Sequence, residues 1–274
     1  MKNVIYCFYE KPVDWHKDYA RITLERAKEY AESIGADFKV FDRNFYPPIV
    51  KEVDKFYKQK RYPHRQWLHF WRCTISSMFF HHEFLDSEYE RMLVMDADVY
   101  ISENAENIFE DRDIEDGISM IPLDGEYENN MKHDIDLFFN TKVDHCFYGP
   151  LVLSDRKTSS LLVDNFITDE EFFRAAESLL YVEEKRGSVV EKYEMENPDA
   201  PKIVTFMEEH LYSYLFHKNN IEANAIDRAR WMGSGMYAME NEIPFNMYHY
   251  PGGTKELLFD KGHLDQLNSK RASL

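Results

Sequence analysis

Short apolar runs and one helical stretch alternate at the start of the chain. Residues 4–9 and 37–41 are apolar and rich in strand-favouring side chains, so each predicts a buried strand. Between them, residues 18–34 carry apolar side chains at helical spacing, and Gly35 is placed to end the predicted helix. A strand, a helix and a strand joined by short links predict a βαβ unit, and therefore a parallel sheet with a right-handed crossover.

The next predicted strand, residues 92–95, follows a long segment of different character. Residues 42–65 combine three prolines with lysines and tyrosines, which predicts an excursion with at most one short helix. Residues 66–85 are dense in aromatic and aliphatic side chains and predict a mostly buried helix. The strand at 92–95 would then extend the parallel sheet.

The second half of the chain predicts further alternation of helices and strands. We expect helices at residues 105–109, 158–166, 169–184 and 203–217, and strands at 117–123, 137–140, 147–153 and 222–226. The polar segment 124–136 predicts a loop, and Asn197-Pro198-Asp199 predicts a turn. The whole pattern predicts one α/β domain over residues 1–274, with a mostly parallel central sheet flanked by helices.

Composition and charge narrow the class of partner. The formal net charge is −17, from 50 acidic and 33 basic residues, so most of the surface would repel nucleic acid or an anionic membrane. The three cysteines form no CxxC pair, which favours a reducing compartment over a disulfide framework. No apolar stretch approaches membrane-spanning length, and the N-terminus has no secretory apolar region. We therefore expect a cytoplasmic protein with no integral membrane segment and no nucleic-acid partner.

The strongest chemical signal follows the strand at 92–95. Asp96 and Asp98 come directly after it, and residues two apart in an extended segment project to the same side. Ligands of open α/β sheets bind outside the carboxyl ends of the strands. Two carboxylates placed there suit a divalent cation held together with substrate phosphates. The alternative is a strand that ends in two solvated acids.

A second signal lies near the C-terminus. His249 is followed by Pro251-Gly252-Gly253 and then by Lys255. A neutral imidazole can bind a metal, glycines let the backbone approach a ligand, and the Lys255 ammonium can reach a phosphate as a point charge. Alone, this stretch is more often an ordinary turn, but together with the acidic pair it favours a metal–phosphate site.

The two motifs together resemble a known family. Asp96-Ala97-Asp98 after an apolar strand resembles the DxD motif of GT-A glycosyltransferases, and residues 249–255 match the HxxGxxK motif of glycosyltransferase family 8, which includes glycogenin and bacterial lipopolysaccharide galactosyltransferases. The segment Asp18-Tyr19-Ala20 resembles the place where that family stacks a Tyr on uracil. The resemblance implies a GT-A, Rossmann-like fold, with a nucleotide-binding half at 1–101 and a sugar- and acceptor-binding half at 102–274.

The resemblance also implies a set of site residues. The expected metal ligands for Mn²⁺ (or Mg²⁺) are Asp96, Asp98 and His249. The residues expected to contact a UDP-sugar donor, including its diphosphate and nucleobase, are Cys7, Phe8, Tyr19, Ala97, Gly252 and Lys255. For Cys7, Phe8 and Tyr19 the alternative is ordinary core packing. Arg72 stands where the family often has a basic residue, and we expect it to face the donor phosphate or Asp96; the alternative is a surface arginine. Lys255 and Arg72 would stabilise the charge on the leaving diphosphate, as catalytic residues.

Glu209 is the remaining catalytic candidate. Glu209-His210 resembles the Asp-Gln pair that touches the transferred sugar, with Glu209 in place of the Asp; the alternative is a solvated acid at a helix start, where the helix dipole favours it. The family's Asn-Ser-Gly is replaced by Phe147-Tyr148-Gly149, with Asn140 as a substitute by position. The family's Pro-Trp after the motif lysine is replaced by Glu256-Leu257. The chain is thus a divergent relative of this pattern.

The function that the sequence favours is transfer of a hexosyl group from a UDP-sugar to a hydroxyl of a glycan, protein or small molecule, with retention at the anomeric carbon as the family implies. One alternative is a haloacid-dehalogenase-like phosphatase with Asp96 as its nucleophile, although its DxD normally follows the first strand. A sugar nucleotidyltransferase is disfavoured because residues 7–13 contain no glycine. The non-enzyme alternative is a nucleotide-sugar-binding module that has lost turnover.

Overall fold

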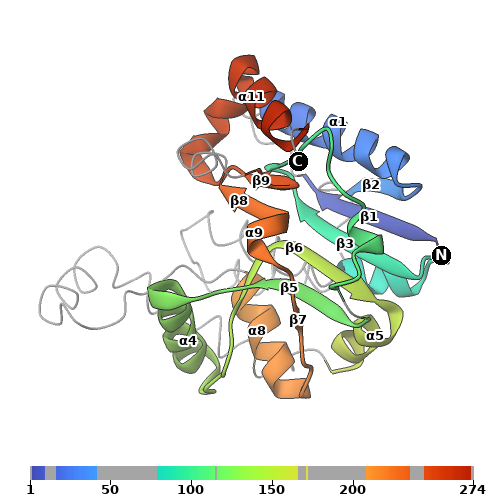
Figure 1. Ribbon diagram of the computed structural model, residues 1–274. Helices are drawn as coiled ribbons and strands as arrows, with labels where there is room; N and C mark the ends of the chain where they lie inside the picture. The colour runs from blue at the N-terminus through green and yellow to red at the C-terminus, as the bar shows by residue number, and fades with distance from the viewer. Residues whose placement is uncertain are drawn as a thin grey trace, which may run out of the picture.

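A six-stranded sheet forms the centre of the computed structural model, which describes residues 2–9, 17–41, 79–114, 116–165, 171, 208–234 and 244–272 (Figure 1). The strand order is β2-β1-β3-β6-β5-β7. The strands are β1 (Asn3–Phe8), β2 (Asp37–Phe41), β3 (Arg91–Asp96), β5 (Ile118–Pro122), β6 (Phe147–Asp155) and β7 (Asn224–Ala225). Both predicted halves of the chain therefore contribute strands to this sheet.

The central sheet is mostly parallel, as expected. Strand β1 pairs in parallel with β2 and with β3, and β5 pairs in parallel with β7. Strand β6 pairs antiparallel with both β3 and β5, so it alone among these six strands runs the other way. Its first residues therefore lie at the edge of the sheet where β1 and β3 end. This reversal adds the start of β6 to the edge at which ligands of such sheets bind.

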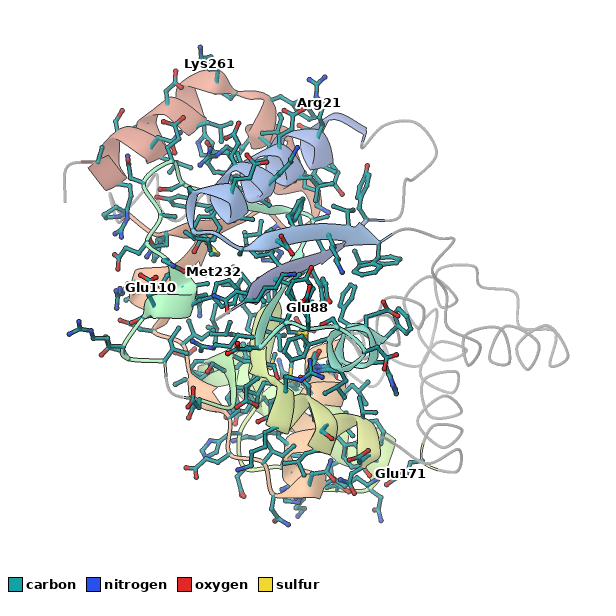
Figure 2. The ribbon with its side chains drawn as sticks, turned by 90° about the vertical axis from the view of Figure 1, so that its right-hand side faces the viewer. Arg21, Glu88, Glu110, Glu171, Met232 and Lys261 are labelled. Carbon is teal, nitrogen blue, oxygen red and sulfur yellow. The ribbon has the colours of Figure 1, made fainter. Side chains whose placement is uncertain are left out.

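Side chains of the central strands alternate between two cores. Val4 and Met92 face a core that contains residues of α4 (Gly125–Phe139), α5 (Arg156–Asp164) and α8 (Glu208–Asn219). Ile5 and Leu93 face the opposite core, which contains residues of α1 (Lys17–Ser33), η2 (Ile108–Glu110) and α9 (Arg228–Trp231). Figure 2 shows these layers from the side, with Arg21 of α1 at the top and Glu171 at the bottom. Apolar runs buried on both faces are what a parallel sheet requires.

A second, three-stranded sheet lies beside the first and was not expected from the sequence. Its order is β4-β9-β8, formed by β4 (Val99–Ile101), β9 (Met247–His249) and β8 (Met232–Ser234). Strand β9 pairs antiparallel with β4 and in parallel with β8. After β9 the chain forms η3 (Gly252–Phe259) and α11 (Lys261–Ala272), and both η3 and α1 contact this region (Figure 1).

Most predicted elements that can be compared are confirmed. The βαβ unit is present as β1, α1 and β2, and Gly35 follows α1 with a φ of 68°, a left-handed conformation that glycine adopts without strain. The strands expected at 92–95, 117–123, 147–153 and 222–226 correspond to β3, β5, β6 and the shorter β7. The helices expected at 158–166 and 203–217 correspond to α5 and the described part of α8.

Three predictions in the middle of the chain differ from the structure. Residues 124–136 were expected to form a loop and 137–140 a strand, but helix α4 runs from Gly125 to Phe139. The helix buries Met131, Ile135 and Phe139 at four-residue spacing, while most of its other side chains are polar. Such a narrow apolar stripe is enough to hold a helix against α8, but the polar excess hides it in the sequence. The helix expected at 105–109 is instead the short 3₁₀ turn η2.

Other predictions lie outside the described residues. These are the excursion at 42–65, most of the helices at 66–85 and 169–184, and the turn at 197–199. Within the described part of the chain, residues 79–85 and Glu171 are helical. No helix among the described residues combines the length and the apolar character needed to cross a membrane.

Candidate active site

The two acidic motif residues lie at the carboxyl end of β3. Asp96 is its last residue and Asp98 lies in the turn that leads to β4. Strand β1 ends beside them, because Phe8 is the register partner of Asp96. Helix α1 holds the turn from the other side, since Thr23 Oγ1 donates a hydrogen bond to the Ala97 carbonyl oxygen at 2.5 Å. The turn is thus held at the carboxyl edge of the sheet, where the sequence predicted a ligand site.

The second sheet brings His249 to the acidic pair. Val99, which follows Asp98 directly, is the register partner of His249 in the β4–β9 ladder. The Tyr250 N–H continues this contact by donating to the Asp98 carbonyl oxygen at 3.1 Å. One ligand atom from each of Asp96, Asp98 and His249 lies within 4.8 Å of the others. Among the described residues, no other group of three such side chains converges in this way.

We call Asp96, Asp98 and His249 the metal cluster. Lys255 lies beside this cluster and adds a positive charge to the site. Its ammonium Nζ lies 2.9 Å from Asp98 Oδ2, while His249 Nε2 lies 3.2 Å from Asp98 Oδ1. Burial works to raise the pKa of Asp98, but the hydrogen bonds and charges of His249 and Lys255 outweigh it and lower that pKa. Burial works to lower the pKa of Lys255, but its contacts with Asp98 and Tyr19 outweigh burial and raise that pKa. Asp98 is therefore held as a carboxylate and Lys255 as a cation.

The residues expected to line a nucleobase pocket lie around this cluster. Tyr19, in the first turns of α1, has the Lys255 ammonium 4.9 Å from its ring centre, and it is nearly buried. Phe8 is half-buried at the end of β1, and Gly252 begins η3. Cys7 is completely buried within β1, and burial, with help from the acidic pair, raises the pKa of its thiol well above the usual range. This placement favours a packing role for Cys7.

Glu209, in the first turn of α8, lies close enough to Asp96 for the charge of that carboxylate to act on it. Only 5% of it is exposed, and its Oε2 has no hydrogen-bond partner among the described residues. Burial, opposed by backbone hydrogen bonds and aided by the charge of Asp96, raises the pKa of its carboxyl from 4.5 to about 7. A buried oxygen without a partner costs free energy, which is a frequent feature of functional sites.

Sequence reasoning missed one contributor to the site, Tyr148, and one buried acid of the nearby helix α4, Asp134. The Tyr148 hydroxyl forms a hydrogen bond with His249 Nδ1, and the only signal was that Tyr148 stands where the resembled family has its Asn-Ser-Gly. Asp134, on the unexpected helix α4, is fully buried and lies 3.5 Å from Nε2 of the buried His210. Both were hidden because they depend on pairings between distant segments.

Of the two remaining sequence candidates, one lies outside the described residues and the other lies at the end of α4. Arg72 lies outside the described residues, so its role stays a prediction. Asn140 is exposed at the end of α4, where it adopts a left-handed φ of 51°. His81 is buried in the core, where its ring nitrogens bond the hydroxyls of Ser159 (2.9 Å) and Tyr212 (3.1 Å).

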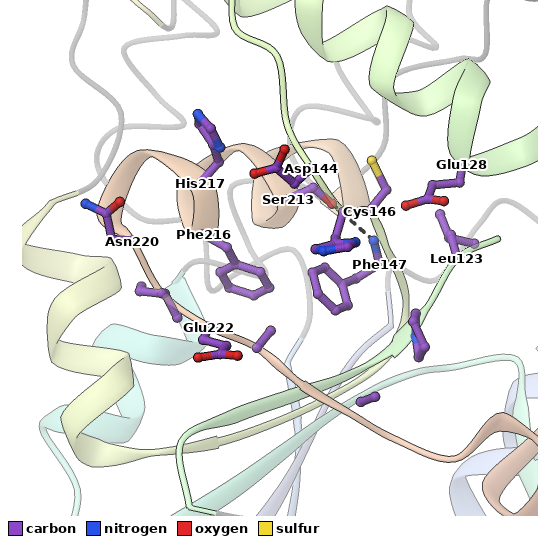
Figure 3. A pocket seen from close by; sticks show the side chains of 15 residues that line it. Leu123, Glu128, Asp144, Cys146, Phe147, Ser213, Phe216, His217, Asn220 and Glu222 are labelled. Atoms are coloured by element: carbon purple, nitrogen blue, oxygen red, sulfur yellow. Dashed lines mark hydrogen bonds between the residues drawn. The ribbon is translucent and has the colours of Figure 1, made fainter.

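A separate pocket of about 480 Å³ lies between α8, the start of β6 and the segment before β7 (Figure 3). Phe147 and Phe216 line it together with the carboxylates of Asp144 and Glu222, and no lysine or arginine is among its lining residues. Such a pocket disfavours a phosphate-bearing ligand. None of the metal-cluster residues lines it, so it is distinct from the candidate donor site.

Comparison with known proteins connects the fold to one class of enzymes. No protein-family model matches the sequence, and no curated protein matches it either. Solved structures do match. A glycosyltransferase involved in glycosylation of the major capsid of PBCV-1 is 14% identical, with a TM-score of 0.51 over 97% of this chain and 100% of that chain.

Two further structures agree with the first. The galactosyltransferase LgtC is 11% identical, with a TM-score of 0.53 over 99% of this chain and 96% of that chain. The bifunctional glycosyltransferase WbbM is also 11% identical, with a TM-score of 0.51 over 99% of this chain and 50% of that chain. At such low identity the likeness concerns the fold, which is that of the GT-A glycosyltransferases, as the sequence predicted.

Proposed function

We propose that this protein is a metal-dependent glycosyltransferase that moves a sugar from a UDP-sugar to a hydroxyl acceptor. The observation that carries the proposal is the convergence of Asp96, Asp98 and His249, which come from distant parts of the chain, at the carboxyl edge of a GT-A sheet. Lys255 lies in direct contact with this cluster. The acceptor would be a glycan, a protein or a small molecule.

The metal cluster fits a divalent cation such as Mn²⁺ or Mg²⁺. Its donor set is two carboxylates and one imidazole, with ligand atoms close enough to share one ion. When bound, the cation would supply Lewis-acid stabilisation to the diphosphate leaving group. The present contacts of Asp98 with His249 and Lys255 show that this carboxylate already attracts positive charge.

Lys255 is the residue we assign to the diphosphate. Its ammonium is held charged within a partly buried site, so it can stabilise the negative charge that develops as the sugar leaves. Gly252, at the start of η3, would let the backbone approach the same phosphates. Arg72 is proposed as a second cation on the sequence pattern alone.

The nucleobase and the sugar would lie on either side of the metal cluster. Tyr19 and Phe8 offer aromatic surfaces beside Asp96 and Lys255, which suits a stacked uracil. Glu209 lies on the side of α8, where we place the transferred sugar. With retention, the departing phosphate oxygen would take the acceptor proton as the new glycosidic bond forms and the old one breaks, and Glu209 would support the sugar.

The solved structures of similar fold support this assignment of partners. One structure of LgtC contains donor and acceptor sugar analogs, so a protein of this fold holds both substrates. The structure of an active-site mutant of LgtC has a TM-score of 0.52 with this chain. The relation to glycosyltransferase family 8, the UDP donor and the retention of configuration remain our proposals.

Donor hydrolysis is the experiment that tests the proposal. The protein is incubated with a panel of UDP-, GDP- and CMP-sugars, with Mn²⁺ or with a chelator, and released sugar is measured together with its anomeric form by NMR. We expect slow Mn²⁺-dependent release from a UDP-sugar, as the anomer that retention predicts, and no release by Asp98→Ala. Nucleotide binding without any sugar release, with acceptors present, would favour the binding-module alternative. Phosphate release from sugar phosphates would instead favour the phosphatase, for which the fold offers no support.

A further inference from the structure

Tyr148 occupies a special place at the edge of the active site. It is the second residue of β6, the strand that runs opposite to its neighbours, and it is half-buried. Its hydroxyl bonds His249 Nδ1, and the two rings pack edge to face with centroids 5.5 Å apart and an interplanar angle of 66°. No motif that we considered assigns a role to this side chain.

An irregular ladder directs Tyr148 to this position. Strand β5 pairs with β6 in a regular antiparallel register up to Met120 and Val152, and the next pair in that register would be Ile121 and Leu151. Instead, Ile121 pairs with Tyr148. The intervening residues include Pro150, which has no N–H to donate to a ladder. Such irregularities re-aim side chains next to functional sites.

The hydrogen bond with Tyr148 determines which ring nitrogen of His249 faces Asp96 and Asp98. A histidine ring can turn about its last torsion at little cost, which exchanges the positions of its ring nitrogens with those of carbons. In the observed orientation Nδ1 meets Tyr148, and Nε2 lies 3.2 Å from Asp98 Oδ1. Turning the ring would lose both contacts.

We infer that Tyr148 is a positioning residue that holds His249 so that Nε2 faces Asp96 and Asp98. For Nε2 to donate its lone pair to a cation, the ring proton must sit on Nδ1, and the Tyr148 oxygen is placed to accept it. Partners of this kind orient metal-binding histidines and increase their basicity. The inference rests on the proposed function, because it requires that the cluster binds a divalent cation.

Mn²⁺ binding without nucleotide or sugar tests the inference. The affinity of the purified protein for Mn²⁺ is measured by the EPR signal of the free ion. Tyr148→Phe keeps the ring and removes only the hydroxyl, so we expect the dissociation constant to rise about 10- to 100-fold. The matched control is Tyr212→Phe, which removes a hydroxyl bonded to His81 Nε2 at 3.1 Å in the core, outside the cluster. We expect its Mn²⁺ affinity to equal that of the wild type.

A double-mutant cycle separates positioning from a general loss of packing. His249→Ala should weaken Mn²⁺ binding at least as much as Tyr148→Phe, and the combination with Tyr148→Phe should be no worse than His249→Ala alone. Additive effects would overturn the inference, as would wild-type affinity in Tyr148→Phe. In either case the proposed function would stand. If the wild type binds neither Mn²⁺ nor Mg²⁺, the metal-dependent function itself fails, and the role of Tyr148 fails with it.

Discussion

Two carboxyl groups near Asp96, those of Asp98 and Glu209, have different neighbours. Asp98 lies between His249 and Lys255, whose bonds and charges lower its pKa in spite of burial. Glu209 is buried with no cation beside it among the described residues, so burial raises its pKa to about 7. Both are acids at the same edge of the sheet.

The difference teaches how one site can use similar side chains for different tasks. A carboxyl group held ionised by cations is suited to bind a metal ion, and one held near neutrality can keep or release a proton at physiological pH. This contrast agrees with our proposed assignments of Asp98 to the metal and of Glu209 to the sugar. Four experiments test this difference between Asp98 and Glu209.

Removing the ionised carboxylate should have the largest effect. Asp98→Ala removes a proposed metal ligand and the partner of Lys255, and we expect sugar transfer to fall by about 10,000-fold, since a catalytic cation is worth several kcal/mol. Nucleotide binding should also lose its dependence on Mn²⁺. Asp86→Ala, which removes an exposed acid far from the cluster, is the control and should transfer sugar at the wild-type rate. Substantial Mn²⁺-dependent turnover by Asp98→Ala would contradict the metal assignment.

Neutralising Glu209 should affect turnover without affecting donor binding. Glu209→Gln keeps the shape of the side chain and removes its charge, so we expect kcat to fall by about 1,000-fold, within the usual range for loss of one group that stabilises charge in the transition state. The affinity for UDP in the presence of Mn²⁺ should change less than threefold. Equal losses in kcat and in UDP affinity would place Glu209 with the donor-binding residues instead.

The raised pKa of Glu209 should also make stability depend on pH. Between pH 4.5 and 7 the folded protein binds more protons at this carboxyl than the unfolded chain does, so its contribution to the free energy of unfolding falls as the pH rises through this window. The full change amounts to roughly 3 kcal/mol. Urea unfolding without added metal, on wild type and Glu209→Gln, measures it. Parallel stability curves for the two proteins across this window would show that Glu209 does not titrate there.

Removing the cation beside Asp98 should have the smallest effect. Lys255→Gln takes away one charge-assisted contact to the diphosphate, and we expect the affinity for UDP with Mn²⁺ to fall about tenfold. The affinity for uridine, which has no phosphate, should not change. Calorimetry on the two ligands provides the comparison, and an equal loss for both would assign Lys255 to the nucleobase.

How far the sequence could predict this molecule depends on the range of the interactions involved. The βαβ unit and the strand before Asp96 were predictable because their apolar patterns are local and are buried on both faces. The proximity of His249 to Asp98 could be inferred only from motif resemblance. It depends on the pairing of β4 with β9, two three-residue strands far apart in the chain.

The missed features share a physical cause. Helix α4 has too narrow an apolar stripe to stand out, and its stability depends on packing against α8. Tyr148 reaches His249 because the β5–β6 register shifts before it, which no local pattern encodes. The opposite pKa shifts of Asp98 and Glu209 depend on burial and on neighbours from other elements, so they too required the fold.

Thermal unfolding with nucleotides is the decisive test of a metal-dependent UDP site. Wild type and Asp98→Ala are melted with UDP, GDP or CMP, each with Mn²⁺ or with a chelator. We expect a clear stabilisation of the wild type by UDP that requires Mn²⁺ and disappears in Asp98→Ala; a ligand at 100 times its dissociation constant adds about 2.7 kcal/mol. No stabilisation by any nucleotide, or a UDP effect of equal size in the chelator and in Asp98→Ala, would contradict it.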